Sequence, residues 1–211
     1  MILHTSTAFF CAALFSLWGH ISHVQARTIT MLGDSITAGY GLEIGQDLAS
    51  RLEQHLRRHD PTLKMMNHGL SGDTTAGGLA RLHIVLNDKP QLMLLALGSN
   101  DALRGLPPSF VKQNLQSIIE QCQQKNLPVF LIGARAPKNW GPNYEQEFQN
   151  IFIDLAKHYK LPFYPFLLEG VALQPSLNQQ DMLHPNAKGV EKIVEQLGPA
   201  IWTYVQTLPK P

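Results

Sequence analysis

The chain has 211 residues, of which 44% are hydrophobic and 16% are charged, and its formal net charge at pH 7 is +1. This length and composition fit one globular domain with a full-sized hydrophobic core. A net charge so close to zero excludes the basic footprint of a nucleic-acid-binding protein, so no nucleic-acid partner is expected.

The first 26 residues form a distinct segment, because they contain no Lys, Arg, Asp or Glu. An apolar run over 8–18 is followed by Val24-Gln25-Ala26, which is close to the A-x-A pattern of a cleavage site. We therefore predict a secretory signal peptide over 1–26, cleaved after Ala26, and a single domain over 27–211. The expected location is periplasmic or secreted. An uncleaved N-terminal membrane anchor is the alternative, although the apolar run is short for a membrane span.

The first half of the predicted domain alternates between strand and helix patterns. A β-branched run over 28–32 predicts the first strand. An apolar residue at every fourth position from Ile44 to Leu56 predicts a helix with one face on the core. A short strand over 63–66 precedes a second helix over 79–86. The uninterrupted apolar run over 91–97 is typical of a central strand in a parallel sheet.

The second half continues this alternation. Apolar spacing predicts long helices over 107–122, 148–159 and 190–201. The apolar segment 129–134 predicts a fourth strand, and the segment 161–166 contains two prolines, which favours a strand at the edge of the sheet. Strand–helix alternation throughout predicts one doubly wound parallel sheet with helices on both faces.

Histidine and cysteine residues give little indication of a metal site or of a thiol nucleophile. His55 and His59 are four residues apart, a spacing that could hold a metal, but no carboxylate partner is evident and we expect a solvated surface pair. Cys122 lies on the apolar stripe of its helix and is expected to be buried rather than reactive. The predicted cleavage removes Cys11, so no internal disulfide is expected.

Polar residues follow the predicted strands, where parallel sheets hold their active sites. Ser35, Gly72 and Asn100 follow the first three strands, while Asp181 and His184 precede the last helix. Loops at the carboxyl ends of parallel strands converge on one crevice. There a histidine can take the proton of a serine nucleophile, and a nearby aspartate can orient the imidazole. The backbone N–H groups of Ser35 and Gly72 and the amide of Asn100 would supply donors to a tetrahedral oxyanion.

Four sequence blocks resemble the signature blocks of the SGNH (GDSL-type) hydrolases, and most closely those of the bacterial periplasmic multifunctional thioesterase, lysophospholipase and arylesterase enzymes. The likeness extends from Thr28 through the last helix and includes Leu-Ala-Arg-Leu at 79–82, whereas the G-x-S-x-G motif of the α/β-hydrolases is absent. Position 99 is Ser where many relatives have Gly. The four blocks are Gly33-Asp34-Ser35, the Gly72 loop, Gly98-Ser99-Asn100-Asp101 and Asp181-Met-Leu-His184-Pro185.

The resemblance implies a flavodoxin-like three-layer α/β/α sandwich with a five-stranded parallel sheet. It implies Ser35 as the nucleophile, His184 as the base and Asp181 as its partner. It also implies an oxyanion hole formed by Ser35, Gly72 and Asn100. Because a serine mechanism needs no metal and the only close histidine pair is expected at the surface, we expect neither a cofactor nor a metal.

The expected activity is hydrolysis of acyl esters and thioesters through an acyl-enzyme, with lysophospholipids and aryl or alkyl esters as small-molecule substrates. The carboxyl groups of Asp34 and Asp101 are interpreted as acceptors that shape their loops. A carbohydrate O-acetylesterase is the first alternative, and a non-catalytic flavodoxin-like binding module is an alternative of another class. We further expect a monomer that contacts a membrane surface at most transiently. An acyl-chain groove is predicted from five residues: Leu103, Leu106, Pro107, Trp140 and Tyr144.

Overall fold

The computed structural model describes residues 26–210, so the predicted signal peptide lies outside the described residues except for Ala26. Five parallel strands form one sheet in the order β2-β1-β3-β4-β5, which confirms the predicted five-stranded parallel sheet. The strands are β1 (Thr28–Gly33), β2 (Lys64–Gly69), β3 (Leu92–Ala96), β4 (Val129–Ile132) and β5 (Phe163–Tyr164).

Helices lie on both faces of this sheet. The longer helices are α2 (Leu48–Leu56), α6 (Pro108–Gln124), α7 (Pro142–Tyr159) and α8 (Ala187–Val205). The short ones are α1 (Ser35–Ala38), α3 (Thr75–Ala80), α4 (Leu82–Leu86), α5 (Ser99–Leu103) and the 3₁₀ helix η1 (Lys138–Trp140). Between residues 26 and 210, none of the helices is long and apolar enough to cross a membrane.

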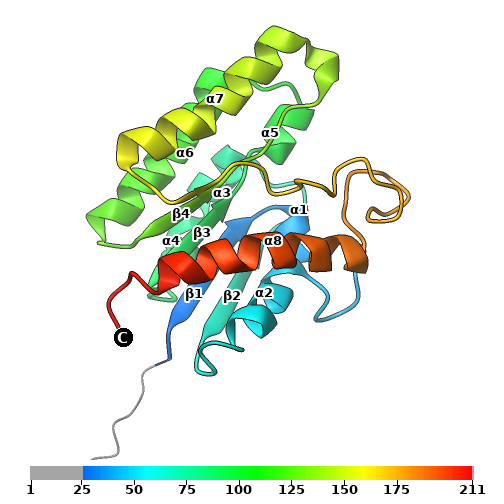
Figure 1. The fold of residues 1–211 in the computed structure, drawn as a ribbon. Helices are drawn as coiled ribbons and strands as arrows, with labels where there is room; N and C mark the ends of the chain where they lie inside the picture. Colours follow the sequence, from blue (N-terminus) through cyan, green and yellow to red (C-terminus); the bar gives the residue numbers. More distant parts are fainter. Residues whose placement is uncertain (1–25, 211) are drawn as a thin grey trace, which may run out of the picture.

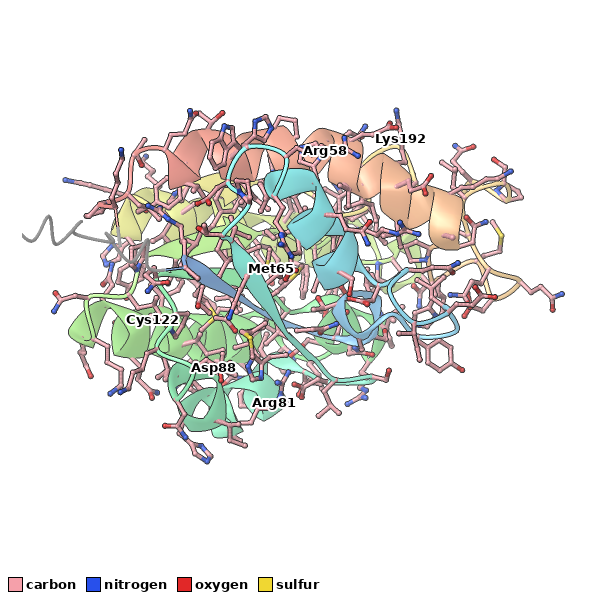
Figure 2. All side chains as sticks on the ribbon, turned by 90° about the horizontal axis from the view of Figure 1, so that it is seen from below. Arg58, Met65, Arg81, Asp88, Cys122 and Lys192 are labelled. Atoms are coloured by element: carbon pink, nitrogen blue, oxygen red, sulfur yellow. The ribbon has the colours of Figure 1, made fainter. Side chains whose placement is uncertain are left out.

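The helices make the molecule a three-layer α/β/α sandwich, as predicted (Figure 1). One face of the sheet is covered by α2 and α8, and the other by α3, α4, α6 and α7. Figure 2 separates the labelled side chains accordingly, with Arg58 and Lys192 on the first side and Arg81, Asp88 and Cys122 on the second.

Alternate residues of the central strands enter two separate hydrophobic clusters. In β3, Leu92 and Leu94 pack toward α2 and α8, whereas Met93 and Leu95 pack toward α6 and α7, and all four are fully buried. Burying one such side chain stabilises the fold by about 1.5–3 kcal/mol relative to exposure. The loops that follow the central strands therefore leave from backbone that is held on both faces.

The direction in which the chain crosses the sheet reverses at β1. The chain moves from β1 to β2 on one side, and then returns past β1 to β3 on the other. Gly33, at the end of β1, is level with Gly69 of β2 and Ala96 of β3. At such a reversal the connecting loops diverge, and a crevice is left at the carboxyl ends of the strands.

Two predicted helices differ from those observed. The helix predicted from Ile44 begins only after Asp47, whose carboxylate caps it by accepting from the Ser50 N–H at 2.9 Å. Ile44 is fully exposed in the preceding loop, so its assignment to the core-facing stripe was wrong. The helix predicted over 79–86 is two helices that meet at Arg81, where φ of −100° and ψ of 6° break the helical path.

Two strands also differ from their predicted bounds. β2 continues to Gly69, past the predicted end at residue 66, because β1 pairs with it along its whole length. The edge strand predicted over 161–166 shortens to the two residues of β5. Pro162 and Pro165, on either side of it, have no N–H to donate to the sheet.

The cysteine and the histidine pair take different places in the fold. Cys122 is buried, as predicted, and this burial raises the pKa of its thiol to about 12. The prediction of a solvated pair was wrong for His55, whose ring packs so closely on Gly198 that a Cβ atom there would be 2.6 Å away. His59 stacks on Trp202 with ring centroids 4.8 Å apart. Within residues 26–210, no cluster of three or more His, Cys, Asp or Glu is placed to hold a metal ion.

Candidate active site

Ser35 lies at the tight turn between β1 and α1. The Asp34 carboxylate caps α1 by accepting from the Ile36 N–H at 3.1 Å. Only glycine fits at position 33, because a Cβ atom there would be 2.0 Å from the Thr37 hydroxyl. Ser35 is therefore the first residue of a helix that begins directly at the end of a buried strand, and its side chain is largely shielded from solvent.

His184 lies between Ser35 and Asp181 in one hydrogen-bonded line. Its Nε2 atom is 2.8 Å from the Ser35 Oγ, and its Nδ1 atom is 2.6 Å from the Asp181 Oδ2. The other carboxylate oxygen accepts from the backbone N–H groups of Leu183 and His184, at 2.9 and 3.0 Å. These bonds, foremost the one from the His184 backbone, lower the pKa of Asp181 to about 2. The carboxylate is therefore ionised at neutral pH and faces the imidazole.

Two further side chains, which no sequence pattern indicated, support the surroundings of His184: Tyr40 contacts its ring and Gln179 joins the two loops beside it. The Tyr40 ring lies over His184 with centroids 4.7 Å apart and planes inclined at 41°. The Gln179 side-chain amide donates to the Tyr40 and Pro185 carbonyls at 2.7 and 3.0 Å, which joins the two loops. Ser35, Tyr40 and His184 line a small crevice. A larger hollow, of about 550 Å³, opens between α6 and α7 and is lined by none of the predicted site residues.

Three potential donors to an oxyanion come from three different loops. The Ser35 N–H is at the free N-terminal end of α1, and the Gly72 N–H is in a turn where φ is +79°. Neither N–H donates to another group among residues 26–210. The Asn100 side-chain amide donates one hydrogen to the Asp73 carbonyl at 2.9 Å, which leaves its second hydrogen for a ligand.

Buried carboxyl groups connect these loops to their surroundings. Asp101 accepts from the Thr75 N–H at 2.9 Å and from the Thr75 hydroxyl at 2.6 Å, and its burial raises its pKa. Burial also raises the pKa of Asp34 to about 6, although hydrogen bonds from the Ile36 backbone and the Ser99 side chain oppose this shift.

The five predicted groove residues lie on α5, just before α6, on η1 and at the start of α7. Leu103 and Trp140 are nearly half exposed, whereas Leu106 and Tyr144 pack against the core. The Trp140 indole N–H donates to the Ala102 carbonyl at 2.9 Å, and the Tyr144 hydroxyl donates to the Leu106 carbonyl at 2.8 Å. Pro107 is exposed and precedes the first residue of α6. This cluster, which we call the α5 cluster, begins directly after the helix turn that carries Asn100.

The sandwich fold and the hydrogen-bonded serine, histidine and aspartate have the arrangement that hydrolases of the serine type use. Comparison with known proteins gives the family, because residues 31–192 match the GDSL-like Lipase/Acylhydrolase family. The chain belongs to this family and is an esterase that acts on small-molecule esters. The alternative of a non-catalytic binding module was therefore wrong.

Named relatives share most of the chain. It is 35% identical to Esterase TesA of Pseudomonas aeruginosa over 90% of this chain and 94% of that protein. It is 36% identical to thioesterase 1/protease 1/lysophospholipase L1 of Escherichia coli, over 76% of each chain. Among solved structures, the SGNH-hydrolase family esterase AlinE4 is 44% identical, with a TM-score of 0.72 over 85% of this chain and 97% of that one.

Proposed function

We propose that Ser35 is the nucleophile of this esterase, His184 its general base and Asp181 the partner that orients the base. The observation that carries the proposal is the line of contacts from Asp181 Oδ2 to His184 Nδ1 at 2.6 Å and from His184 Nε2 to Ser35 Oγ at 2.8 Å. Both distances lie in the range of strong hydrogen bonds, and the residue types are those of nucleophilic acyl transfer.

The reaction begins when Ser35 Oγ attacks the carbonyl carbon of the acyl group while His184 Nε2 takes the hydroxyl proton. The resulting tetrahedral oxyanion accepts hydrogen bonds from the Ser35 N–H, the Gly72 N–H and the free amide hydrogen of Asn100. When the bond to the leaving alcohol or thiol breaks, His184 returns the proton to it. Water then repeats the sequence on the acyl-enzyme and releases the carboxylic acid.

The substrates that we propose are acyl esters and acyl thioesters, including lysophospholipids and aryl esters. The names of the relatives, which include an arylesterase from Vibrio mimicus, support this range. The exposed faces of Leu103 and Trp140 in the α5 cluster supply an apolar surface for the acyl chain. A carbohydrate O-acetylesterase remains the alternative, and it predicts a preference for acetyl over octanoyl esters.

We also propose that the protein is exported and works in the periplasm as a monomer, touching membrane surfaces only transiently. The uncharged, apolar N-terminal segment and the A-x-A-like sequence ending at Ala26 support export. Fractionation of the cells that express the full chain, with N-terminal sequencing of the purified protein, tests this proposal. An N-terminus other than Arg27 would contradict the cleavage site.

The decisive experiment is hydrolysis by purified protein of p-nitrophenyl esters and acyl thioesters of increasing chain length, and of a lysophospholipid. Ser35→Ala should abolish turnover and labelling by a fluorophosphonate, because no nucleophile remains to form the covalent adduct. Ser117→Ala is the matched control, since its hydroxyl bonds only to the Gln113 carbonyl on α6. Normal turnover by Ser35→Ala, or a strict preference for acetyl esters, would contradict the proposal.

A further inference from the structure

The side chain of Arg81 lies where three segments of the chain meet, and the catalytic scheme above does not use it. Its Nε donates to the Asp73 carboxylate at 2.7 Å. One of its terminal nitrogens donates to two backbone carbonyls, that of Gly33 at 3.0 Å and that of His68 at 2.9 Å. Arg81 is therefore bonded to the end of β1, the end of β2 and the loop that follows β2.

Two of these partners, Gly33 and Asp73, are close in the chain to groups of the proposed site. Gly33 is two residues before Ser35, and Asp73 directly follows Gly72. The backbone carbonyl of Asp73 also accepts the hydrogen bond from the Asn100 amide at 2.9 Å. Arg81 thus bonds to the strand end before Ser35 and to the residue that follows Gly72, and it is linked to the Asn100 amide through the backbone of Asp73.

The geometry points to a role that only arginine can fill at this position. A guanidinium is planar and presents several N–H groups at fixed angles, whereas a lysine ammonium is a single point charge on a flexible stem. The Arg81 side chain is 18% exposed and that of Asp73 is 6% exposed, so the pair is largely removed from solvent. In such surroundings the hydrogen bonds hold strongly and fix the positions of the groups that they join.

We propose that Arg81 is a positioning residue that holds the Gly72–Asp73 loop and the Asn100 amide in place against the Ser35 turn. The inference rests on the proposed function, because it assigns to Arg81 the arrangement of the oxyanion donors named there. The break between α3 and α4 at Arg81 fits this role, since its φ and ψ end one helix at the residue whose side chain reaches the strand ends. Figure 2 labels Arg81 on the side of the sheet where these two helices lie.

The first test compares Arg81→Gln with Arg27→Gln. Arg27 is the matched control because its guanidinium is also buried and also donates to two backbone carbonyls, those of Val205 and Pro209, but at the opposite end of β1. A misplacement of catalytic groups by about 1 Å can cost about 100-fold in rate, so Arg81→Gln should lower kcat by about 10- to 100-fold with KM nearly unchanged. Arg27→Gln should lower the melting temperature while leaving kcat within about 2-fold.

Arg81→Lys gives a second readout if Arg81→Gln folds poorly. It keeps the positive charge beside Asp73 but cannot make all three bonds at once, so its kcat should fall between those of the wild type and Arg81→Gln. Asp73→Asn removes the carboxylate while keeping the carbonyl that Asn100 needs, and should resemble Arg81→Lys. A normal kcat in folded Arg81→Lys and folded Asp73→Asn would overturn the inference.

A double-mutant cycle with Asn100→Ala separates positioning from general stability. If Arg81 acts by placing the oxyanion donors, Arg81→Gln should cost less than about 3-fold in kcat once the Asn100 amide is absent. The inference would be overturned if the loss of kcat in the double variant equalled the product of the losses in Arg81→Gln and Asn100→Ala. It would also be overturned if Arg27→Gln lost as much kcat as Arg81→Gln. Failure of the proposed function has a different signature, because it requires that Ser35→Ala or Asn100→Ala keep normal activity.

Discussion

The turn that carries Ser35 and the loop that carries His184 meet across a 2.8 Å contact, yet they are held by different parts of the molecule. The Ser35 turn begins at the end of a buried strand, and Asp34 beside it is only 2% exposed. The His184 loop lies at the surface, where the side chain of Asp181 is 36% exposed and that of Leu183 is also exposed. The proposed nucleophile is thus held by the core, whereas the proposed base is held by bonds within its own loop and by the Tyr40 ring.

This difference means that changes in the two regions should have different consequences. The hydrogen bonds of Asp181 lie within three residues of it, so a substitution there disturbs the catalytic line with little effect on the core. Asp34 is buried and caps α1, so we expect a substitution there to change the stability of the domain. Four predictions, ordered by the size of the expected effect, test this division.

The largest effect is expected from Asp181→Asn. An amide can hold neither the correct imidazole tautomer nor the positive charge that His184 acquires, so kcat should fall on the order of 10³- to 10⁴-fold. The melting temperature should change little, because the side chain is exposed and its bonds are local. Asp154→Asn, which alters an exposed carboxylate paired with Lys112, is the control and should leave kcat unchanged. A similar kcat for both variants would mean that Asp181 is not the partner of His184.

Asn100→Ala should have the next largest effect. Its amide hydrogen bond strengthens as the carbonyl becomes tetrahedral, so its loss should fall on kcat with KM nearly unchanged. Removing one such donor costs about 10²- to 10³-fold in rate. Fluorophosphonate labelling should still occur, only more slowly, since nucleophile and base remain. Near-normal kcat on a short-chain ester would remove Asn100 from the oxyanion hole.

Asp34→Asn should change stability and its dependence on pH. Burial raises the pKa of Asp34 to about 6 in the folded protein, above the unfolded value of 3.8, so the folded state binds this proton more tightly. The wild type therefore loses stability as the pH rises from about 4 to about 6, while the variant does not. Asn can keep the cap on α1. The difference in unfolding free energy between the variant and the wild type should therefore shift in favour of the variant by up to about 3 kcal/mol between pH 4 and pH 7. The same difference in denaturation midpoint between the wild type and the variant at both pH values would contradict this prediction.

Alkylation of Cys122 should have the smallest effect. The thiol is fully buried beneath α6, away from both catalytic regions, and its pKa of about 12 keeps it protonated. A small thiol reagent should leave the native enzyme active and react only after denaturation, which mass spectrometry can follow. Rapid inactivation of folded protein would show that the thiol is accessible.

The strands and the long helices were predictable because their apolar spacing records which faces are buried. The uninterrupted apolar run of β3 and the apolar stripe of α6 predicted buried residues, and the structure buries these same residues. Ile44 kept the same spacing but lies outside α2, because spacing alone does not reveal that Asp47 starts the helix. The candidate site residues were also predictable, because each of the four sequence blocks places a turn-forming residue close to a residue that can take part in catalysis.

The supporting contacts of the site could not be predicted from spacing. Arg81 lies between Leu79 and Leu82 in a pattern that predicts one continuous helix, and nothing there indicates that its side chain turns toward two strand ends and the Asp73 loop. Tyr40 and Gln179 are 139 residues apart, and only the fold brings them together around His184. Such contacts depend on tertiary distances, which local sequence does not contain.

The separation of Ser35 and His184 by 149 positions also sets when the enzyme can first act. Synthesis proceeds from the N-terminus, so the ribosome makes Ser35 long before His184, which we propose activates it. A nascent or truncated chain that lacks His184 carries the proposed nucleophile without its proposed base. Because α8 follows His184 and must pack on α2, reactivity arises only when late-made segments settle on early-made ones. The proposed catalytic line can therefore form only after α8 has been made.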